Sequence, residues 1–421
     1  MQNLTLCVAR PSSGLDPHTP LLVSHKMPPV PENHVLIEVD RFGFSANNVT
    51  YQALGEAPHF RYFEFHNPPS DGVVSPASHG LVPVWGFGTI VKSTVPSLLV
   101  GERVYGYFAP TRYLLLPVSL SEVNKYNFLI PRPHLPPDRR PYNTVRRCTT
   151  DPEYDPSPIS EDLMMLYRPL FWTAFWCEDW LQASKYRGAS SILMSSASSK
   201  TAFCLAYLVK KRNQNGTVMK VVGLTSNRNL TFTKNLGLYD EVLDYESLET
   251  AKSLQDTSEK WVYIDVAGND VLNERVQRHF AAQSNLMAGI QLGLTNLSPS
   301  APSAATTHFS TNTALVDPAG PVQLCGQLKL EQFFMPEWLV VRRSQMTVLE
   351  LIAMQAQAWK DLMEDGKDWV KIERLYGGAA IVDAYRRVAT NGTDAASGMI
   401  WSLWDSPELG RKPHAEPESK L

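Results

Sequence analysis

The sequence predicts an α/β protein in two parts, a small β-barrel or sandwich and a doubly wound parallel sheet. Two observations lead to this prediction. Short strand-like runs separated by frequent turns fill the stretch from His34 to Pro117, which is typical of a small barrel or sandwich. From about Ser160, short apolar strands alternate with helices, a pattern that predicts a parallel sheet with right-handed crossovers. The length of 421 residues allows two to three domains.

The β part is predicted from period-two alternation. His34–Asp40 alternates apolar and polar residues and is rich in β-branched side chains. Gly86–Val91 is a second short strand, whose glycines allow close backbone approach. Gly101–Tyr107 has the character of a turn followed by a strand, and Arg112–Pro117 of one more strand.

A proline-dense stretch, about 131–158, separates the two parts. Its eight prolines remove backbone donors and fix φ, so we expect no regular structure there. Two interpretations are open. It is an ordered surface insertion or linker, or it is a substrate lid, since long loops in compact domains are often functional.

The second part shows five apolar strands with helices between them. The expected strands are 191–194, 220–224, 241–243, 260–265 and 286–290. The expected helices are 163–182 (interrupted at Pro169), 201–212, 229–236, 349–364 and 379–389, with a last strand at 398–402. The segment 298–313 has the composition of a loop.

Composition excludes several classes of function. The 39 Lys and Arg against 42 Asp and Glu leave no basic excess, so we expect no nucleic-acid partner. No apolar run approaches the ~20 residues that a membrane span needs, and the start shows no secretory signal.

The five cysteines form no CxxC pair, which argues against a structural zinc site and fits the reducing cytosol, so we expect a cytoplasmic protein.

Several segments, in order, carry a resemblance to a known superfamily. They are 35–55, 84–91, 100–107 (VGERVYGY), 171–175, 191–211, 235–245, 265–268 and 367–402. Together they resemble the medium-chain dehydrogenase/reductase superfamily, particularly its zinc-independent quinone and enoyl reductases. In this resemblance 35–55 corresponds to the first barrel strands and 171–175 to the start of a helix. The segments ANNVTYQALGE (46–56), SSASSKTA (195–202) and 223–228 resemble its DUF2855 subset more closely.

The resemblance implies a fold and an activity. It implies a GroES-like β-barrel domain (1–160 and 341–421, with the proline-rich insertion) and a Rossmann domain (161–340). It implies a reductase of a C=C or C=O bond. The zinc ligands of metal-dependent relatives correspond to Phe42 and to 85–88, where no ligand set remains, so we expect no metal. Members of the superfamily often form dimers through the edge of the Rossmann sheet, so we expect a homodimer.

The first strand-to-helix turn of the Rossmann domain is the predicted phosphate site. The superfamily places glycines at positions held here by Ser199, Lys200 and Ala202. Small side chains still permit close approach, serine hydroxyls donate to phosphate oxygens, and Lys200 adds positive charge. We therefore expect Ser198, Ser199, Lys200 and Thr201 to bind the cofactor. The alternative is a remodelled turn that no longer binds a dinucleotide.

The end of the second strand indicates which cofactor binds. An NAD site would hold Asp or Glu there for the ribose 2′-hydroxyl, but this chain has Thr225, Ser226 and Arg228 and no acid. Hydroxyl donors and a planar cation suit a 2′-phosphate, so NADPH is the predicted cofactor. The alternative is that Ser226 caps the next helix and Arg228 is solvated.

Three further cofactor contacts come from the resemblance alone. Thr173 would touch the cofactor, and Gly268 and Thr295 would border the ribose and nicotinamide. Capping of a helix by Thr173, and ordinary turns at the other two strand ends, are the alternatives.

The catalytic candidates are Tyr51, Asn48 and Asn47, in the segment that faces nicotinamide in similar reductases. Without a metal, polarising a carbonyl needs a neutral donor, and a Tyr hydroxyl or Asn amide supplies one. The alternative is that the two asparagines form a turn and Tyr51 packs in the core.

The sequence thus predicts an NADPH-dependent, zinc-independent reductase of a hydrophobic small molecule. One setting for such a reductase is secondary metabolism. Two rivals remain. One is a redox-neutral lyase, dehydratase or cyclase on the same fold. The other is a non-catalytic partner in a biosynthetic assembly. No G-x-S-x-G motif supports a hydrolase.

Overall fold

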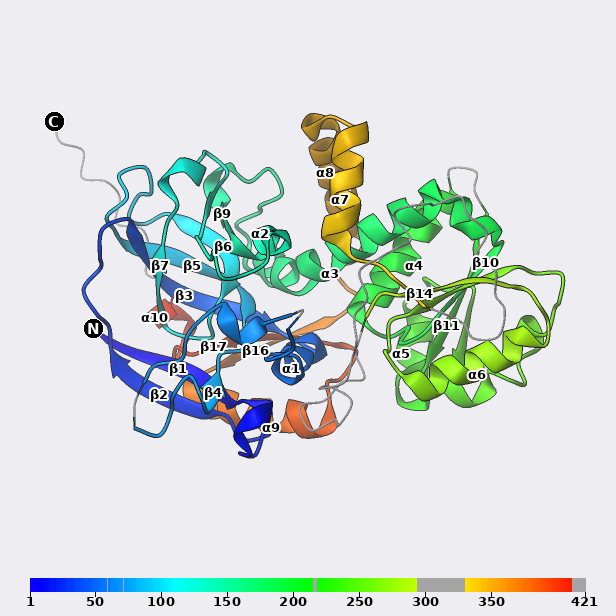
Figure 1. The fold of residues 1–421 in the computed structure, drawn as a ribbon, viewed down its shortest axis with the longest axis horizontal. Coiled ribbons are helices and arrows are strands. Elements are labelled where there is room, and N and C mark those ends of the chain that lie inside the picture. The colour runs from blue at the N-terminus through cyan, green and yellow to red at the C-terminus, as the bar shows by residue number, and fades with distance from the viewer. Residues whose placement is uncertain (59, 71, 215–217, 294–329, 411–421) are drawn as a thin grey trace. The chain divides into compact units, whose positions relative to one another are not determined.

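The chain forms two compact units (Figure 1). The structure, a computed structural model, describes all residues except 59, 71, 215–217, 294–329 and 411–421. Among the described residues, the β unit comprises 1–166 and 356–410, and the α/β unit comprises 167–293 and 330–355. Thr295 and the whole segment predicted as loop, 298–313, lie outside the described residues.

The β unit contains mostly short strands. Its strands are β1 Gln2–Ala9, β2 Leu21–Lys26, β3 His34–Phe44, β4 His79–Gly80, β5 Val84–Ser93, β6 Arg103–Phe108, β7 Tyr113–Pro117, β8 Asn127–Leu129, β9 Thr144–Arg147, β16 Lys371–Tyr376 and β17 Ser397–Ser402. Its helices are α1 Ala46–Ala53, α2 Arg140–Asn143, α9 Gly378–Asn391 and α10 Pro407–Gly410. Two helices contribute residues to both units, α3 Pro158–Ala183 and α8 Val348–Asp365.

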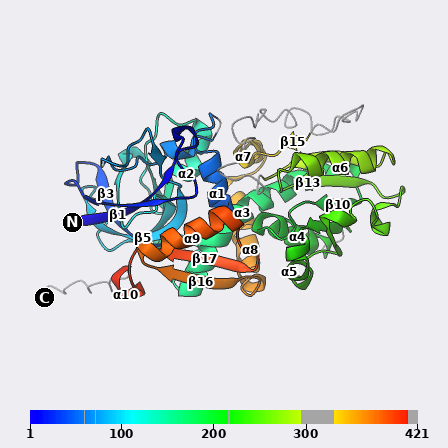
Figure 2. The same cartoon turned by 90° about the horizontal axis from the view of Figure 1, so that it is seen from below.

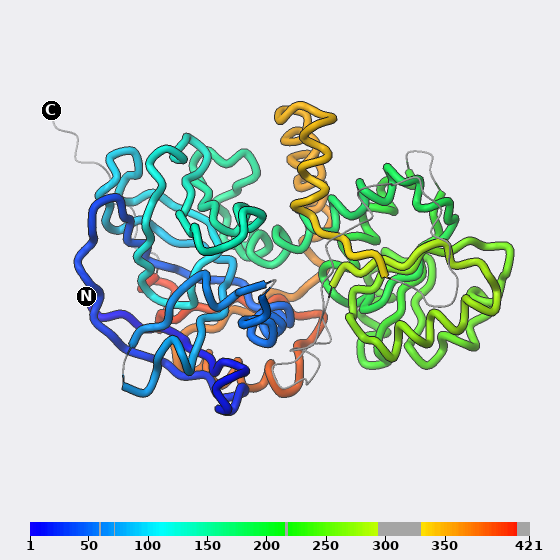
Figure 3. Tube along the Cα trace, in the orientation of Figure 1, coloured from blue at the N-terminus to red at the C-terminus, as the bar shows by residue number. Residues whose placement is uncertain are grey.

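One large sheet organises the β unit in the order β16-β17-β3-β5-β6-β9-β8, with β7 also paired to β3. A second, three-stranded sheet has the order β2-β1-β4. The C-terminal strand β17 pairs antiparallel with β3, so the end of the chain returns among the N-terminal strands, as the red and blue tubes show (Figure 3). Helix α9 runs beside β16 and β17 (Figure 2).

The predicted strands 34–40, 86–91, 104–107 and 112–117 are all confirmed. Two predictions in this unit are wrong. The segment 46–53, expected to extend the barrel strands, is helix α1, which begins at a capping box between Ser45 and Asn48. The proline-rich stretch, expected to be irregular, contains α2 and strand β9, which pairs with both β6 and β8. Its prolines lie outside β9, where they interrupt no ladder hydrogen bond.

The α/β unit is built on one parallel sheet of six strands. The strands are β10 Ser191–Met194, β11 Lys220–Thr225, β12 Glu241–Asp244, β13 Trp261–Asp265, β14 Leu286–Gln291 and β15 Glu331–Gln332. The helices are α4 Lys200–Asn213, α5 Leu230–Asn235, α6 Asp270–Ala281 and α7 Met335–Gln345. The strand order β12-β11-β10-β13-β14-β15 is the 3-2-1-4-5-6 order of a dinucleotide-binding sheet.

Five strands of this sheet are confirmed from the sequence, and so are α4 and α5. The helix predicted to break at Pro169 is one continuous helix, α3, with the proline inside it. Apolar side chains on nearly every face of α3 are buried, including those of Trp176 and Trp180. Packing on several faces therefore outweighs the ~3 kcal/mol cost of an interior proline.

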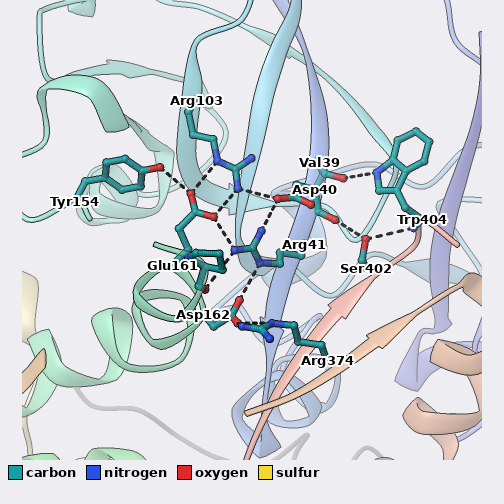
Figure 4. Close-up of polar contacts among 11 residues, drawn as sticks. Val39, Asp40, Arg41, Arg103, Tyr154, Glu161, Asp162, Arg374, Ser402 and Trp404 are labelled. Atoms are coloured by element: carbon teal, nitrogen blue, oxygen red, sulfur yellow. Dashed lines mark hydrogen bonds and ion pairs between the residues drawn. The ribbon is translucent and has the colours of Figure 1, made fainter. Parts of the chain in front are cut away.

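A buried ionic network holds the β unit together around Arg41 of β3 (Figure 4). The Arg41 guanidinium lies 2.6 Å from Asp40, 2.7 Å from Glu161 and 2.8 Å from Asp162. Arg103 of β6 also pairs with Asp40 and Glu161, and Arg374 of β16 pairs with Asp162. Three guanidinium groups thus balance three carboxylates, and the network links β3, β6 and β16 to the first turns of α3.

Candidate functional site

The carboxyl ends of β10 and β13 mark the point where the strand order of the sheet reverses. Ligands bind at such a switch point in open α/β sheets. The Ser195 hydroxyl connects the two strand ends: it donates to Asp265 Oδ1 at 2.9 Å and accepts from the Val266 and Ala267 amides at 2.9 and 3.0 Å. The phosphate turn after β10 therefore starts from a fixed point.

The backbone of the predicted phosphate turn is held by two tyrosines of the same unit. Ser196 has a left-handed backbone, φ +50°, a conformation that glycine adopts without strain. Its amide donates to the Tyr245 hydroxyl, and the Tyr239 hydroxyl donates to the Ala197 carbonyl at 2.7 Å. Gly223 of β11 lies against Ala197, where an added Cβ would meet the Ala197 methyl at 2.7 Å.

The predicted cofactor residues 198–201 lie at the N-terminus of α4. Ser199 is the N-cap, and its hydroxyl accepts from the Ala202 amide, so Lys200 and Thr201 are the first two helical residues. The first amides of a helix lack intrahelical partners and form an anion site together with the helix dipole. The Ser198 hydroxyl is buried and accepts from Asn229 at 3.1 Å, so its contact ties the turn to the segment after β11.

The end of β11 carries the three residues predicted to select NADPH. The Thr225 hydroxyl is buried and has no hydrogen-bond partner in the described part of the chain. Ser226 occupies an N-cap position but makes no side-chain cap bond, so the capping alternative is not what this serine does. Arg228 lies on the short 3-10 turn that follows, its side chain exposed, one residue before the Asn229 that contacts Ser198. The structure therefore brings the end of β11 and the phosphate turn together.

The remaining two cofactor candidates in this unit have internal roles. Gly268 has φ +64°, and its amide donates to Asp265 Oδ1 at 2.9 Å, so this amide closes the turn after β13. Burial raises the pKa of Asp265, opposed by hydrogen bonds from Asn273, Gly268 and Ser195. Thr173 lies well inside α3, where its hydroxyl donates to the Pro169 carbonyl at 3.3 Å. The expectation that 171–175 begins a helix is wrong, because α3 starts at Pro158.

The catalytic candidates share helix α1 in the β unit. The Asn47 side-chain amide donates to the Tyr51 hydroxyl at 2.7 Å. Asn48 has a structural role: its carbonyl oxygen accepts from the Ser45 amide, and its amide donates to the Pro83 carbonyl at 3.2 Å. The structure thus joins Asn47 to Tyr51 as a pair and assigns Asn48 to the start of the helix.

Tyr51 belongs to a tyrosine cluster, which we define as Tyr51, Tyr62, Tyr107 and Tyr142. The Tyr51 ring lies 4.2 Å from that of Tyr62 and 6.1 Å from that of Tyr107, and Tyr107 lies 5.2 Å from Tyr142. Burial raises the pKa of all four hydroxyls. These tyrosines are therefore neutral hydrogen-bond donors at physiological pH.

The sequence matches the family described as "Protein of unknown function (DUF2855)" over residues 42–394. The chain belongs to this family. Among curated proteins, none matches the DUF2855 chain. This membership confirms the subset identified from the sequence, and it assigns no chemistry.

Solved structures show the fold that the DUF2855 chain shares. CurA from Vibrio vulnificus in complex with NADPH is 12% identical, with a TM-score of 0.55 over 95% of this chain and 98% of that chain. Mycobacterial Rv1454c complexed with NADPH is 13% identical, with a TM-score of 0.52 over 95% and 99%. The quinone oxidoreductase from Coxiella burnetii is 14% identical, with a TM-score of 0.51 over 95% and 99%. At this identity the likeness confirms the predicted architecture, a GroES-like domain with a Rossmann domain.

Sequence reasoning missed several residues of both sites in the DUF2855 chain. Tyr239 and Tyr245 fix the phosphate turn, yet each looked like an ordinary residue beside β12. Tyr142 belongs to the tyrosine cluster, and Arg132 lies close to its member Tyr107. Both residues lie in the proline-rich stretch, which the sequence predicted to be irregular. Within the described ranges, no helix has the length and apolar character to span a bilayer, and no group of three or more His, Cys, Asp and Glu side chains is placed to hold a metal.

Proposed function

We propose that this protein is an NADPH-dependent, zinc-independent reductase that reduces a C=C or C=O bond of a hydrophobic small molecule. One observation carries the cofactor assignment. At the end of β11 the chain has a buried Thr225 hydroxyl that finds no hydrogen-bond partner among the described residues and, three residues on, Arg228, where an NAD site would hold an acid. NADPH in the complexes of CurA and Rv1454c, which share the fold, supports the same cofactor.

The residues of the α/β unit fit this cofactor. The N-terminus of α4, from Ser199 to Thr201, would hold the pyrophosphate through backbone amides and the helix dipole. Thr225, Ser226 and Arg228 would hold the 2′-phosphate through hydroxyl donors and a planar cation. Gly268 and Thr173 remain proposed neighbours of the cofactor by resemblance. In the structure the Gly268 amide and the Thr173 hydroxyl donate to other groups of the protein.

When bound, NADPH supplies a hydride from C4 of its nicotinamide. The β unit supplies the neutral donor that stabilises the negative charge left on the substrate oxygen. Tyr51 suits this role because burial raises the pKa of its hydroxyl and keeps it protonated. Asn47 donates to the Tyr51 oxygen, which leaves the tyrosine proton for the substrate. The same high pKa makes Tyr51 a weak acid, so solvent completes the protonation.

Replacing Arg228 with Ala tests the cofactor assignment. A hydrogen bond to a charged group contributes about 1.5–3 kcal/mol, so the Kd for NADPH should rise by about 10- to 100-fold. The Kd for NADH, which lacks the 2′-phosphate, should stay the same. Calorimetry on the full chain measures both constants. Arg278→Ala, an exposed arginine of α6 in the same unit, is the matched control. Equal losses for the two cofactors, or none, would contradict the assignment.

Two further proposals concern the setting of the protein. Cys7, Cys148, Cys177 and Cys204 are buried thiols, which suits the reducing cytoplasm proposed as its location. A homodimer through an edge of the six-stranded sheet is proposed from the resemblance, and light scattering on the purified protein measures it. A monomeric mass would exclude it.

A further inference from the structure

Arg132, in the proline-rich stretch, is a buried cation that makes no ion pair with any acidic side chain of the described residues. Only 8% of the residue is exposed. Its guanidinium donates to the Phe65 carbonyl at 2.9 Å and to Asn143 Oδ1 at 2.8 Å, and its Nη2 lies 3.5 Å from His66 Nε2. Burial lowers the pKa of Arg132 to about 10, and the one opposing influence is the Tyr107 hydroxyl, not a carboxylate.

This arrangement differs from that of two arginines in the ionic network of the β unit. Arg41 and Arg103 share three carboxylates at 2.6–2.8 Å, so their charge is balanced inside the protein. Transfer of a guanidinium from water into the protein interior costs several kcal/mol, and hydrogen bonds to neutral carbonyl groups offset only part of that cost. A guanidinium has five donors, and the Phe65 carbonyl and Asn143 Oδ1 accept from two of those of Arg132. His66 Nε2 donates to the Tyr107 carbonyl and so does not accept from Arg132. Both the charge and the remaining donors of Arg132 are therefore left for an anion.

The groups around Arg132 complete an anion site. In the described part of the chain the buried Tyr107 hydroxyl has no hydrogen-bond partner of normal geometry, and its interaction with the Tyr51 hydroxyl is a weaker one that, together with burial, raises the pKa of Tyr107. Burial, and then the charge of Arg132, lower the pKa of His66 to about 3, so His66 is neutral, and its Nε2 lies 3.0 Å from the Tyr107 carbonyl. The Tyr107 hydroxyl thus lies beside Tyr51 and close enough to Arg132 to oppose the lowering of the arginine's pKa, while the rings of Phe65 and Trp85 pack 5.2 and 5.0 Å from that of Tyr107.

We propose that Arg132 and Tyr107 bind a carboxylate of the substrate, so that the substrate is an apolar, unsaturated carboxylic acid. A carboxylate matches the planar guanidinium fork, and the surrounding aromatic rings suit an apolar body. The proposal rests on the proposed function and narrows its substrate class. It also gives the proline-rich stretch a role in substrate binding, because Arg132 and Tyr142 both belong to it.

The test compares two probes on the full chain, trans-cinnamate and its uncharged methyl ester. Calorimetry with and without NADPH should give a Kd for cinnamate at least about tenfold below that of the ester, the size of one charge-assisted contact. Arg132→Met should remove this preference for the acid. Arg140→Met should keep it, because Arg140 is an exposed arginine of the same stretch that pairs with Glu122 at 2.6 Å.

The outcomes separate clearly. Equal affinity for acid and ester in the wild-type protein would overturn the proposal, and so would a folded Arg132→Met variant that keeps the preference. Should Arg132→Met fail to fold, Tyr107→Phe decides, since it removes one hydroxyl and keeps the ring. It should weaken cinnamate binding at least about threefold and leave the ester unchanged, and an unchanged cinnamate Kd would overturn the proposal. Absence of NADPH binding together with a preference for the acid would contradict the proposed function and support the anion site.

Discussion

Replacing Tyr51 with Phe is expected to lower kcat for reduction of an enone by about 10²- to 10³-fold, the effect of losing one donor to a developing oxyanion. The ring that packs 4.2 Å from Tyr62 stays in place, so the variant should fold. NADPH affinity should not change, because Tyr51 lies in the β unit and the proposed cofactor residues in the α/β unit. Initial rates of NADPH oxidation, with the enone that the wild-type protein reduces fastest, measure the effect.

Tyr385→Phe is the matched control for this variant. It also removes one buried hydroxyl of the β unit, which bonds to Gln52 at 2.6 Å outside the tyrosine cluster. It should cost about 1 kcal/mol of stability and leave kcat unchanged. Asn47→Leu should lower kcat less than Tyr51→Phe, since Asn47 acts through the Tyr51 hydroxyl. If Tyr51→Phe keeps the wild-type kcat, the tyrosine takes no part in the reduction.

Arg41→Met is expected to destabilise the protein by about 3–5 kcal/mol, because it leaves the buried carboxylates of the ionic network short of one positive charge. Asp40, Glu161 and Asp162 all contact the Arg41 guanidinium, and none of the three is more than 4% exposed at the side chain (Figure 4). Urea unfolding followed by circular dichroism measures the loss.

Arg386→Met is the control, an arginine whose ion pair with Asp383 is exposed and should contribute about 0–1 kcal/mol. The pH dependence adds a second signature. Burial alone would raise the pKa of Glu161, but the hydrogen bond and charge of Arg103 and the charge of Arg41 outweigh it, and the pKa lies below its ordinary value. This stabilisation is present above the unfolded pKa of about 4.3 and is lost as the pH falls through the lowered value. Equal losses for Arg41→Met and Arg386→Met would contradict this account of the network.

The pattern of apolar residues predicted the strands and helices correctly where one face of the element, or every face, is buried. The runs 191–194 and 260–265 are apolar because both faces of the parallel sheet are covered, and both were found as β10 and β13. Local rules failed where tertiary contacts decide. Pro169 lies inside a continuous helix, and 144–147 pairs as β9 although prolines surround it. Strand β16 was missed because its side chains are only partly buried and lack the alternation of a half-buried strand.

The candidate site shows the same division. The position of Thr225 and Arg228 at and after the end of β11 was predictable because the strand is visible in the sequence as an apolar run. The pairing of Asn47 with Tyr51 follows from their spacing of four residues only once 46–53 is known to be a helix. Arg132 was not predictable, since its burial depends on contacts with residues about 66 positions away.

The central claim is that the serine-containing turn at the N-terminus of α4 still binds a dinucleotide. Titration of the purified full-length protein with NADPH, followed by nicotinamide fluorescence, tests it most directly. We expect a saturable change with a Kd in the micromolar range, and binding of NADH at least about tenfold weaker, the effect of one charged contact. No saturable change with NADPH up to millimolar concentration would contradict the claim.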